Sequence, residues 1–446
     1  MNRSSSGLKK PPPFETSSPS PVLVSLLIAG KSKIVSTPQT PTPSNQSLTV
    51  SMRLDDSLQT IFATLPNLRL GRIVRPSVAS RYAAKRAFLN HGTLPVFEYP
   101  KTANVDFFKI RQTLTVARQS LAADNSPAPL KQLYEYKLNE YATRLDLVEA
   151  ITQSDDARVT ALSYKLYGQP NFSSEDFERE FEKRCLDLKH ERVHHHAKRI
   201  DAKTFATQVH EALERLRIEN VEIRLSTRTR VLCQRNPHSG KLFIRIPKKL
   251  SISRNRAKRL IAHEIEIHAL RRQNGAQSQL HILEHGTAGY VKTEEGLALY
   301  HQAKRVPSSH HLPGFWDSWT IALMQRLGFA QAYQRVFDAK KTLLDLAHTK
   351  NAAHLAQEKA WDLCVRACRG ITHPGKPGLV YAKDSIYRAG YLAVHKAMMQ
   401  TDADKLFKTL HQGKIGLEDI QRIASLNLNP QLSLHQSITS AYASKE

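Results

Sequence analysis

The segment HEIEIH at residues 263–268 places two histidines five positions apart and constrains the fold more than any other feature of the sequence. Ser253 stands before a run rich in Arg, Ala, Lys and Leu, which predicts a capped helix through the segment, and Asn274-Gly275 provides its stop. The Glu-Ile-Glu-Ile alternation would also suit a strand. The length of the run and the good helix formers before it favour a helix.

Histidines five positions apart do not share a face of a regular α-helix. At 3.6 residues per turn their side chains diverge by about 140°, whereas a four-residue spacing leaves them about 40° apart. A one-residue π-bulge would bring both imidazoles to the same side, and such bulges occur mainly at functional sites. We therefore predict a local widening of the helix near Ile265 to Ile267. A regular helix there would count against a shared metal ion.

The segment TEEG, farther along the chain, offers a third ligand. We expect Thr293 to cap the next helix, Glu295 to lie in its first turn and Gly296 to allow close approach. Two neutral imidazoles and one carboxylate form the His₂Glu zinc arrangement of hydrolytic enzymes, which leaves a coordination position for water. The candidate metal ligands are therefore His263, His268 and Glu295.

The carboxylate beside the first histidine is the candidate general base. A zinc ion lowers the pKa of its bound water to about 7, and Glu264 can accept the proton. Glu266, two positions later, is expected either to support the ligands from behind or to lie on the surface.

A second histidine pair competes for the same role. Residues 281–285, HILEH, match the inverted metallopeptidase pattern H-x-x-E-H, with the histidines at the regular four-residue spacing. This segment is short and runs into Gly286 and Gly289, so it is less suited to a long supporting helix. With 20 histidines in 446 residues, chance pairs beside a glutamate are also frequent. Spacing alone leaves both pairs, and coincidence, open.

Composition and hydrophobic spacing divide the chain into four parts. Residues 1–75, rich in Ser, Pro and Thr, are expected to form a disordered basic tail. Residues 76–200 are expected to form a helical subdomain that is interrupted at the NSPAP segment. Residues 201–435 should form the zinc metallopeptidase core, and residues 436–446 a C-terminal tail.

Two stretches before the histidine segment have the alternation of strands. Residues 221–225 and 242–246 alternate apolar and polar side chains, and NPHSG precedes the second stretch, which predicts strands and a hairpin. The fold class is therefore α+β, a helix-rich metallopeptidase-like domain with a small sheet before the metal-binding helix. An edge strand beside that helix could pair with the backbone of a peptide substrate.

Charge and composition restrict the partners. Lys and Arg number 65 against 40 Asp and Glu, giving a formal net charge of +25, so acidic protein surfaces should attract the chain. Neither finger spacing nor an aromatic RNA-binding strand motif occurs, and we predict no specific nucleic-acid partner.

No apolar run reaches the roughly 18 residues of a membrane span. Scattered cysteines, with Cys364 and Cys368 as ordinary buried thiols, suit a reducing compartment, and we expect a cytoplasmic location.

The charge also supports an alternative class of function. A non-catalytic basic regulatory or nucleic-acid-associated protein could use the histidine segment as core or as a structural metal site.

Several segments together resemble a known family. HEIEIHALRRQNG and TEEGLALY are similar to the QEGLA-motif proteins and the microtubule-associated tyrosine carboxypeptidases. The resemblance continues through CVRACRG and GLVYAKDSIYRAG, and more weakly through PVFEY and LYGQP, so it covers roughly residues 90–430. It implies that His263, His268 and Glu295 bind one zinc ion and that Glu264 is catalytic. It thereby selects this pair over the H-x-x-E-H pair.

The resemblance further implies a metallocarboxypeptidase that removes one residue, often tyrosine, from a protein or peptide C-terminus. Such an enzyme needs a cation for the free carboxylate, and the candidate substrate contacts are Arg366, Arg369, Lys383 and Tyr387. Each cation could instead form a structural salt bridge. Tyr387 could also stabilise a developing oxyanion.

The TEEG segment departs from the TQEG of bacterial relatives, so the resemblance predicts the reaction more firmly than the substrate. In tubulin-acting relatives the partner is an acidic polymer surface.

Overall fold

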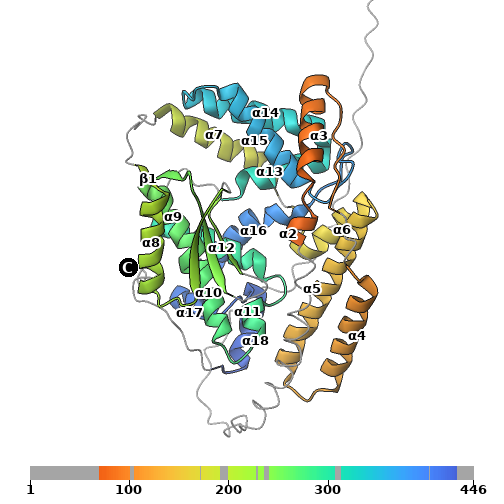
Figure 1. Ribbon diagram of the computed structural model, residues 1–446, viewed down its shortest axis with the longest axis vertical. Helices are drawn as coiled ribbons and strands as arrows, with labels where there is room; N and C mark the ends of the chain where they lie inside the picture. Colours follow the sequence, from red (N-terminus) through yellow and green to blue (C-terminus); the bar gives the residue numbers. More distant parts are fainter. Residues whose placement is uncertain are drawn as a thin grey trace, which may run out of the picture. The chain divides into compact units, whose positions relative to one another are not determined.

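The computed structural model describes residues 70–100, 105–170, 172–190, 199–227, 230–235, 241–306, 313–400 and 402–428. Within these ranges helices predominate and the strands form two small sheets, so the predicted α+β class is confirmed (Figure 1). The N-terminal helices are α2 (Leu70–Ile73), α3 (Val78–His91), α4 (Phe107–Ala123), α5 (Ala128–Thr152), α6 (Asp156–Tyr167) and α7 (Ser174–His190).

Side-chain caps and a proline mark the starts of the N-terminal helices. The side chain of Asp106 accepts a hydrogen bond from the backbone of Lys109 and caps α4, and Asp155 caps α6 in the same way. Pro127 stands at the N-terminus of α5, where its missing N–H costs no helical hydrogen bond. The predicted interruption at the NSPAP segment is thus confirmed.

The strands lie between α7 and the histidine segment. They are β1 (Arg199–Asp201), β2 (Val221–Ser226), β3 (Leu232–Arg235), β4 (Leu242–Pro247) and β5 (Ser251–Ser253), with α8 (Ala202–Arg215) after β1. One sheet pairs β1 with β5, and the other has the order β2-β4-β3. The predicted hairpin is the antiparallel pair β3 and β4, whereas β2 pairs with β4 in parallel. Strand β3 is therefore an edge strand.

The remaining elements are mostly helices: α9 (Arg254–His263), the π-helix η2 (Glu264–Ala269), α10 (Leu270–Ala276), α11 (Ile282–His285), α12 (Tyr290–Arg305), α13 (Phe315–Leu327), α14 (Phe329–Leu346), α15 (Ala352–Ala367), the 3₁₀ turn η3 (Ala382–Ser385), α16 (Ile386–Gln400), α17 (Ala403–Leu410), the 3₁₀ turn η4 (Leu417–Asp419) and α18 (Ile420–Ser425). Helices α12 and α16 pack side by side (Figure 1).

Two hydrophobic clusters hold these elements together. The first combines α2 to α6 with α13, α14 and α15 around the fully buried Trp361. The second joins α8 and β4 to η2, α12, α16 and α17, with Ile244 and Ile267 at its centre. The helices of residues 76–200 thus share a core with helices from residues 201–435. The predicted domain boundaries stay predictions.

The predicted tails fall largely outside the described residues. Of residues 1–75 only 70–75 are described; α2 occupies part of them, and Ile73 and Val74 are buried. Residues 429–446 are also outside the description. Among the described helices, none has the length and apolar character required to cross a membrane. Cys364 and Cys368 are fully buried and make no disulfide, as expected for ordinary thiols.

Candidate metal centre

One continuous helical segment carries both histidines of the candidate site. The hydroxyl of Ser253 accepts a hydrogen bond from the backbone of Arg256, and α9 runs from there to His263. The π-helix η2 follows directly and contains His268. The predicted widening is confirmed, and it brings the ring centroids of the two histidines to 4.7 Å.

The π turn lets one short segment satisfy two demands. Ile265 and Ile267 are fully buried in the second hydrophobic cluster, whereas His263, Glu264 and His268 remain partly exposed. A regular helix would turn one histidine away from the other. The extra residue in the turn keeps the isoleucines in the core and both imidazoles on the open side.

The third ligand comes from α12, which starts earlier than the sequence suggests. Gly289, with a φ of 68°, stands before its first residue, and the carboxylate of Glu140 accepts the Gly289 N–H at 3.0 Å. The prediction that Thr293 caps this helix is wrong, because Thr293 lies inside it and its hydroxyl accepts the backbone N–H of Leu417. Glu295 consequently lies in the second turn of the helix.

The predicted close approach at Gly296 is confirmed. A Cβ added to Gly296 would lie 2.2 Å from the carbonyl carbon of Gly390 on α16. Glycine is required at this crossing because the two backbones touch. The close packing of α12 on α16 fixes the height at which Glu295 faces the histidines.

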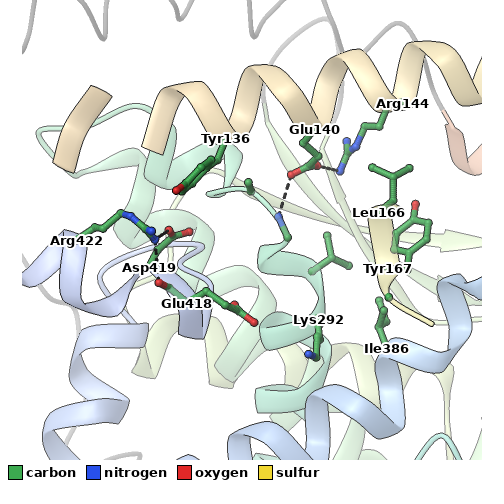
Figure 2. A pocket seen from close by; sticks show the side chains of 14 residues that line it. Tyr136, Glu140, Arg144, Leu166, Tyr167, Lys292, Ile386, Glu418, Asp419 and Arg422 are labelled. Carbon is green, nitrogen blue, oxygen red and sulfur yellow. Dashed lines mark hydrogen bonds and ion pairs between the residues drawn. The ribbon is translucent and has the colours of Figure 1, made fainter. Parts of the chain in front are cut away.

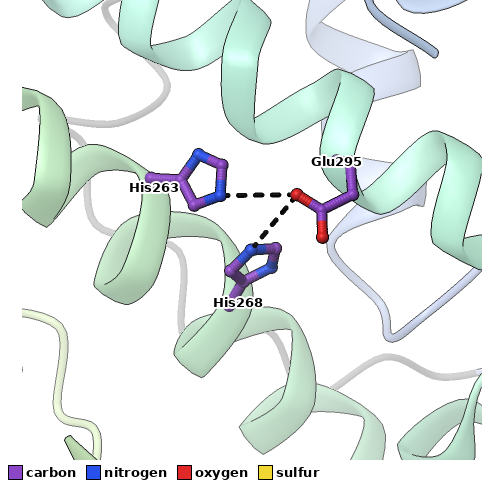
Figure 3. A group of neighbouring side chains, drawn as sticks. All are labelled: His263, His268 and Glu295. Atoms are coloured by element: carbon purple, nitrogen blue, oxygen red, sulfur yellow. Dashed lines mark ion pairs between the residues drawn. The ribbon is translucent and has the colours of Figure 1, made fainter. Parts of the chain in front are cut away.

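The three candidate ligands converge on one point (Figure 3). Nε2 of His263 lies 3.5 Å, and Nε2 of His268 3.9 Å, from the same carboxylate oxygen of Glu295. Donor atoms about 2.1 Å from a tetrahedral zinc ion are separated by about 3.4 Å. Within the described part of the chain, this is the one group of three or more such side chains that could hold a metal ion.

The Nδ1 atoms of both histidines have partners that orient the rings. Nδ1 of His268 lies 2.8 Å from a carboxylate oxygen of Glu294, and Nδ1 of His263 lies 2.8 Å from the amide group of Gln302. Glu294 is held in turn by the fully buried Arg271. Such partners fix the tautomer and direct Nε2 toward a metal.

The carboxylates and the imidazoles of the site shift one another's pKa values. Burial opposes protonation of His268, but Glu294 and Glu295 outweigh it and raise the pKa of this imidazole to about 9. Burial likewise tends to raise the pKa of Glu295, and His263 and His268 hold it below its usual value. The site therefore attracts a cation, which a metal ion can supply in place of the proton.

Glu264 faces the edge strand of the sheet. Its carboxylate accepts a hydrogen bond from the backbone N–H of Cys233 on β3 at 3.0 Å. The predicted proximity of an edge strand to the metal-binding helix is thus confirmed. The carboxylate of Glu264 is held in place beside the candidate ligands.

Glu266 points into the protein and is 1% exposed, so a surface position is excluded. It accepts hydrogen bonds from Arg215 at 2.9 Å, from His301 at 2.6 Å and from Arg305 at 2.7 and 3.0 Å. Burial tends to raise its pKa, but His301 and Arg305 prevail and lower it to about 2. Glu266 ties the π turn to α8 and α12 and supports the ligands from behind.

The rival histidine pair has no comparable arrangement. It lies on and before α11, which has only four residues, and Glu284 pairs with Arg272 at 2.6 Å. The described residues place His281 and His285 in no group of three metal-binding side chains.

Two of the predicted substrate contacts, Arg366 and Arg369, already form ion pairs with carboxylates of the protein. Arg366 donates to Asp384 at 2.8 Å and lies 3.1 Å from Asp317, and Arg369 lies 3.3 Å from Asp384. Arg366 and Arg369 line a cavity of about 610 Å³ that reaches Leu232 on β3. Their roles in substrate binding stay predictions.

Lys383 lies on η3, the turn that contains Asp384, and Tyr387 lies in the first turn of α16. Burial, followed by the negative charge of Glu295, raises the pKa of Tyr387, so its hydroxyl keeps its proton. Lys383 is partly exposed. The effect of Glu295 places Tyr387 within electrostatic reach of the candidate metal centre.

Two further cavities border α12. The larger, of about 450 Å³, lies along its first turn, where side chains of α5, α12 and α18 surround it (Figure 2). The smaller, of about 260 Å³, opens onto the metal centre and is lined by Cys233, Gln234, Leu242, His268, Arg272, Tyr290, Val291, Glu294, Glu295 and Lys414. Val291 lines both cavities.

Several residues of the site were missed by the sequence analysis. Glu294 could have been anticipated, since zinc-binding histidines usually donate to a carboxylate and Glu294 stands beside Glu295. Gln302, Arg271 and Lys414 carry no such signal. Arg271 lies within the HEIEIHALRRQNG segment, whereas Gln302 and Lys414 belong to no quoted motif, and the roles of all three depend on the fold.

The chain resembles known proteins over most of its length. A family model described as microtubule-associated tyrosine carboxypeptidase matches residues 86–305 and 339–436, more than two thirds of the chain. The matched ranges include both histidines, Glu264 and Glu295.

Individual relatives are more distant. Microtubule-associated tyrosine carboxypeptidase 1 from Homo sapiens is 28% identical over 172 residues, and its counterpart from Rattus norvegicus is 27% identical over 172 residues. Each alignment covers 37% of this chain and 32% of the relative. A putative tyrosine carboxypeptidase from Mus musculus is 27% identical over 173 residues, covering 37% of this chain and 30% of the relative. The matches thus span about a third of the length of these curated relatives. On the breadth of the family match, this chain belongs to the microtubule-associated tyrosine carboxypeptidase family.

Proposed function

We propose that this protein is a zinc-dependent metallocarboxypeptidase that removes one residue, in particular tyrosine, from a protein or peptide C-terminus. The observation that carries the proposal is the convergence of His263, His268 and Glu295 on one point with Glu264 beside them. The family description supports the choice of a carboxypeptidase among zinc hydrolases.

The donor set fits zinc. Two imidazole nitrogens and one carboxylate oxygen leave room for water in a tetrahedral site, which is the arrangement of catalytic rather than structural zinc. When bound, zinc would supply the Lewis acidity that activates water and polarises the scissile carbonyl group. Zinc on Nε2 requires a proton on Nδ1, and Glu294 accepts that proton from His268. The amide nitrogen of Gln302 faces Nδ1 of His263, so a half-turn of this amide brings its oxygen into position to accept the Nδ1 proton of His263.

Glu264 moves the proton in the proposed reaction. Its carboxylate takes a proton from the attacking water as the water oxygen bonds to the carbonyl carbon, and passes it to the nitrogen of the leaving residue as the C–N bond breaks. The products are the shortened chain and a free amino acid. The Cys233 N–H holds the carboxylate in position, and the protonated hydroxyl of Tyr387 can donate to the developing oxyanion.

The surroundings of the site suit a peptide. The outer edge of β3 faces the π turn, so an extended substrate can pair with it and cross the metal centre. The small cavity, of about 260 Å³, lies below the range of about 300–1,000 Å³ that holds drug-sized ligands, which suits a single terminal residue. Arg366 and Arg369 remain candidate contacts beyond the end of the strand.

The net charge of +25 supports an acidic protein surface as the partner, and the free thiols of Cys364 and Cys368 suit the cytoplasm as the place of action. The proposed attraction should weaken as salt rises, since screening shortens electrostatic reach.

A peptide library tests the proposal directly. Zinc-loaded protein is incubated with peptides that differ only in the last residue, and the products are identified by mass. We expect loss of one terminal residue, fastest for tyrosine, abolished by chelation and restored by zinc. Protein that binds no stoichiometric zinc, or that cleaves no peptide when loaded, would contradict the proposal and favour the non-catalytic alternative.

A further inference from the structure

The small cavity at the metal centre is lined by a partly buried lysine that belongs to none of the sequence motifs. His268 and Glu295 contribute to the lining, and so do Tyr290 and Lys414. Lys414 lies between α17 and η4, far from the histidines in the sequence. A cation in this position faces the same space as the candidate ligands.

In the described part of the chain, Lys414 forms no ion pair with a carboxylate. Its ammonium group lies 5.7 Å from the centre of the Tyr290 ring, and burial lowers its pKa although Glu294 opposes this. The other cation of the cavity, Arg272, pairs with Glu284 at 2.6 Å. A partly buried cation that makes no ion pair is incompletely solvated, and a bound anion would stabilise it.

The backbone around Lys414 is fixed to the ligand helix. Arg271 donates to the carbonyl groups of Gly413 at 3.0 Å and Ile415 at 2.8 Å, on either side of Lys414. The same guanidinium holds Glu294, which orients His268. The position of the lysine is therefore set by the network that positions a metal ligand.

The arginines predicted from the sequence differ in this respect. Arg366 and Arg369 share the carboxylate of Asp384, so a substrate carboxylate would have to compete with an ion pair already made. Lys414 has no such competitor.

We infer that Lys414 binds the C-terminal carboxylate of the substrate and thereby restricts the enzyme to the last residue of a chain. The ammonium group can donate charge-assisted hydrogen bonds to the carboxylate, while the walls formed by Tyr290, Val291 and Leu242 receive the terminal side chain. This inference rests on the proposed carboxypeptidase activity and assigns its specificity to one residue.

The test compares a peptide ending in tyrosine as the free acid with the same peptide as the C-terminal amide. Binding is measured in zinc-loaded Glu264→Gln protein, where turnover is expected to be slow, with and without Lys414→Met. We expect the preference for the free acid to fall by about 10- to 100-fold in the Lys414→Met protein, because one charge-assisted hydrogen bond contributes about 1.5–3 kcal/mol. Binding of the amide should change little.

Matched variants keep the result interpretable. Lys405→Met, which removes an exposed lysine on α17, should leave the preference intact. Lys414→Arg should retain much of it, and Lys414→Gln replaces Lys414→Met if that protein fails to fold. An unchanged preference in a folded, zinc-loaded Lys414→Met or Lys414→Gln protein overturns the inference. Failure of the proposed function is separate: wild-type protein would then cleave neither peptide.

Discussion

Glu264 and Glu266 stand two positions apart on the same π turn, yet their surroundings differ in kind. Glu266 is 1% exposed and accepts hydrogen bonds from three side chains, those of Arg215, His301 and Arg305. Glu264 is partly exposed and accepts a hydrogen bond from the backbone N–H of Cys233. A carboxylate whose oxygens are fully occupied by cations supports structure, whereas one with spare capacity beside convergent donors can take part in chemistry.

The two faces of the turn depend on each other. The Glu266 contacts fasten η2 to α12, and α12 carries Glu295. A π turn is a rare conformation, and packing on one face must stabilise the geometry that the other face uses. The comparison predicts that substitutions on the two faces fail in different ways.

The largest expected effect on activity is that of Glu264→Gln. The amide cannot accept the proton from water, so kcat/KM should fall by about 10²- to 10⁴-fold. Peptide cleavage measures this loss. Zinc content and the midpoint of thermal unfolding should stay close to those of the wild type, because the ligands and the buried contacts are unchanged. Full activity in this variant would remove Glu264 from the mechanism.

Glu266→Gln should instead act on stability. Loss of the charge leaves the partly exposed Arg215 and Arg305 without their buried counter-ion and weakens the hydrogen bond to His301, which should lower the free energy of unfolding by about 1–3 kcal/mol. Denaturant titration measures the change. An unaltered midpoint would show that the two glutamates do not divide structure and chemistry as proposed.

The pH dependence of Glu266→Gln sharpens the same point. The pKa of Glu266 is lowered from 4.5 to about 2 in the folded protein, so its stabilising effect is complete above about pH 4.5 and is lost as the pH falls toward 2. The stability difference between wild type and variant should therefore shrink over this window. A constant difference would contradict the ionised state of the buried carboxylate.

Local spacing was sufficient to predict the faces of the turn. The five-residue gap between His263 and His268 required a π-bulge, and η2 supplies it. Periodicity predicted the fold class, whereas the choice of His263 and His268 over the rival pair rested on the resemblance to a family. These features depend on a few neighbouring residues, which is why the sequence reveals them.

The predictions that were wrong or missing concern residues whose partners lie far away in the sequence. Thr293 has the composition of an N-cap, but Glu140, far upstream on α5, binds the Gly289 N–H and starts α12 earlier. Arg271 is anchored by carbonyl groups at Leu410, Gly413 and Ile415, more than a hundred residues away. In both cases the partner lies far away in the sequence, so no local sequence pattern could predict the contact.

Glu294→Gln should have an intermediate effect, a loss of zinc affinity. The amide keeps the shape but removes the charge that orients His268 and raises its basicity. Loss of such a partner typically weakens metal binding by about 10- to 100-fold. Competition with a zinc chelator measures the affinity. Unchanged zinc affinity would mean that His268 is positioned by the π turn alone.

The smallest expected effect is that of Gln302→Met, the matching change at the other histidine. Gln302 is neutral, and its hydrogen bond to Nδ1 of His263 should contribute about 0.5–1.5 kcal/mol, equivalent to roughly a 2- to 10-fold change in zinc affinity. The same chelator competition applies. Glu294 carries a charge and Gln302 does not. Comparing the losses of zinc affinity in the two variants therefore tests whether the charge of the partner or only the orientation of the imidazole determines how strongly the histidine binds zinc. Equal losses in the two variants would favour orientation, and a larger loss for Glu294→Gln would assign the difference to its charge.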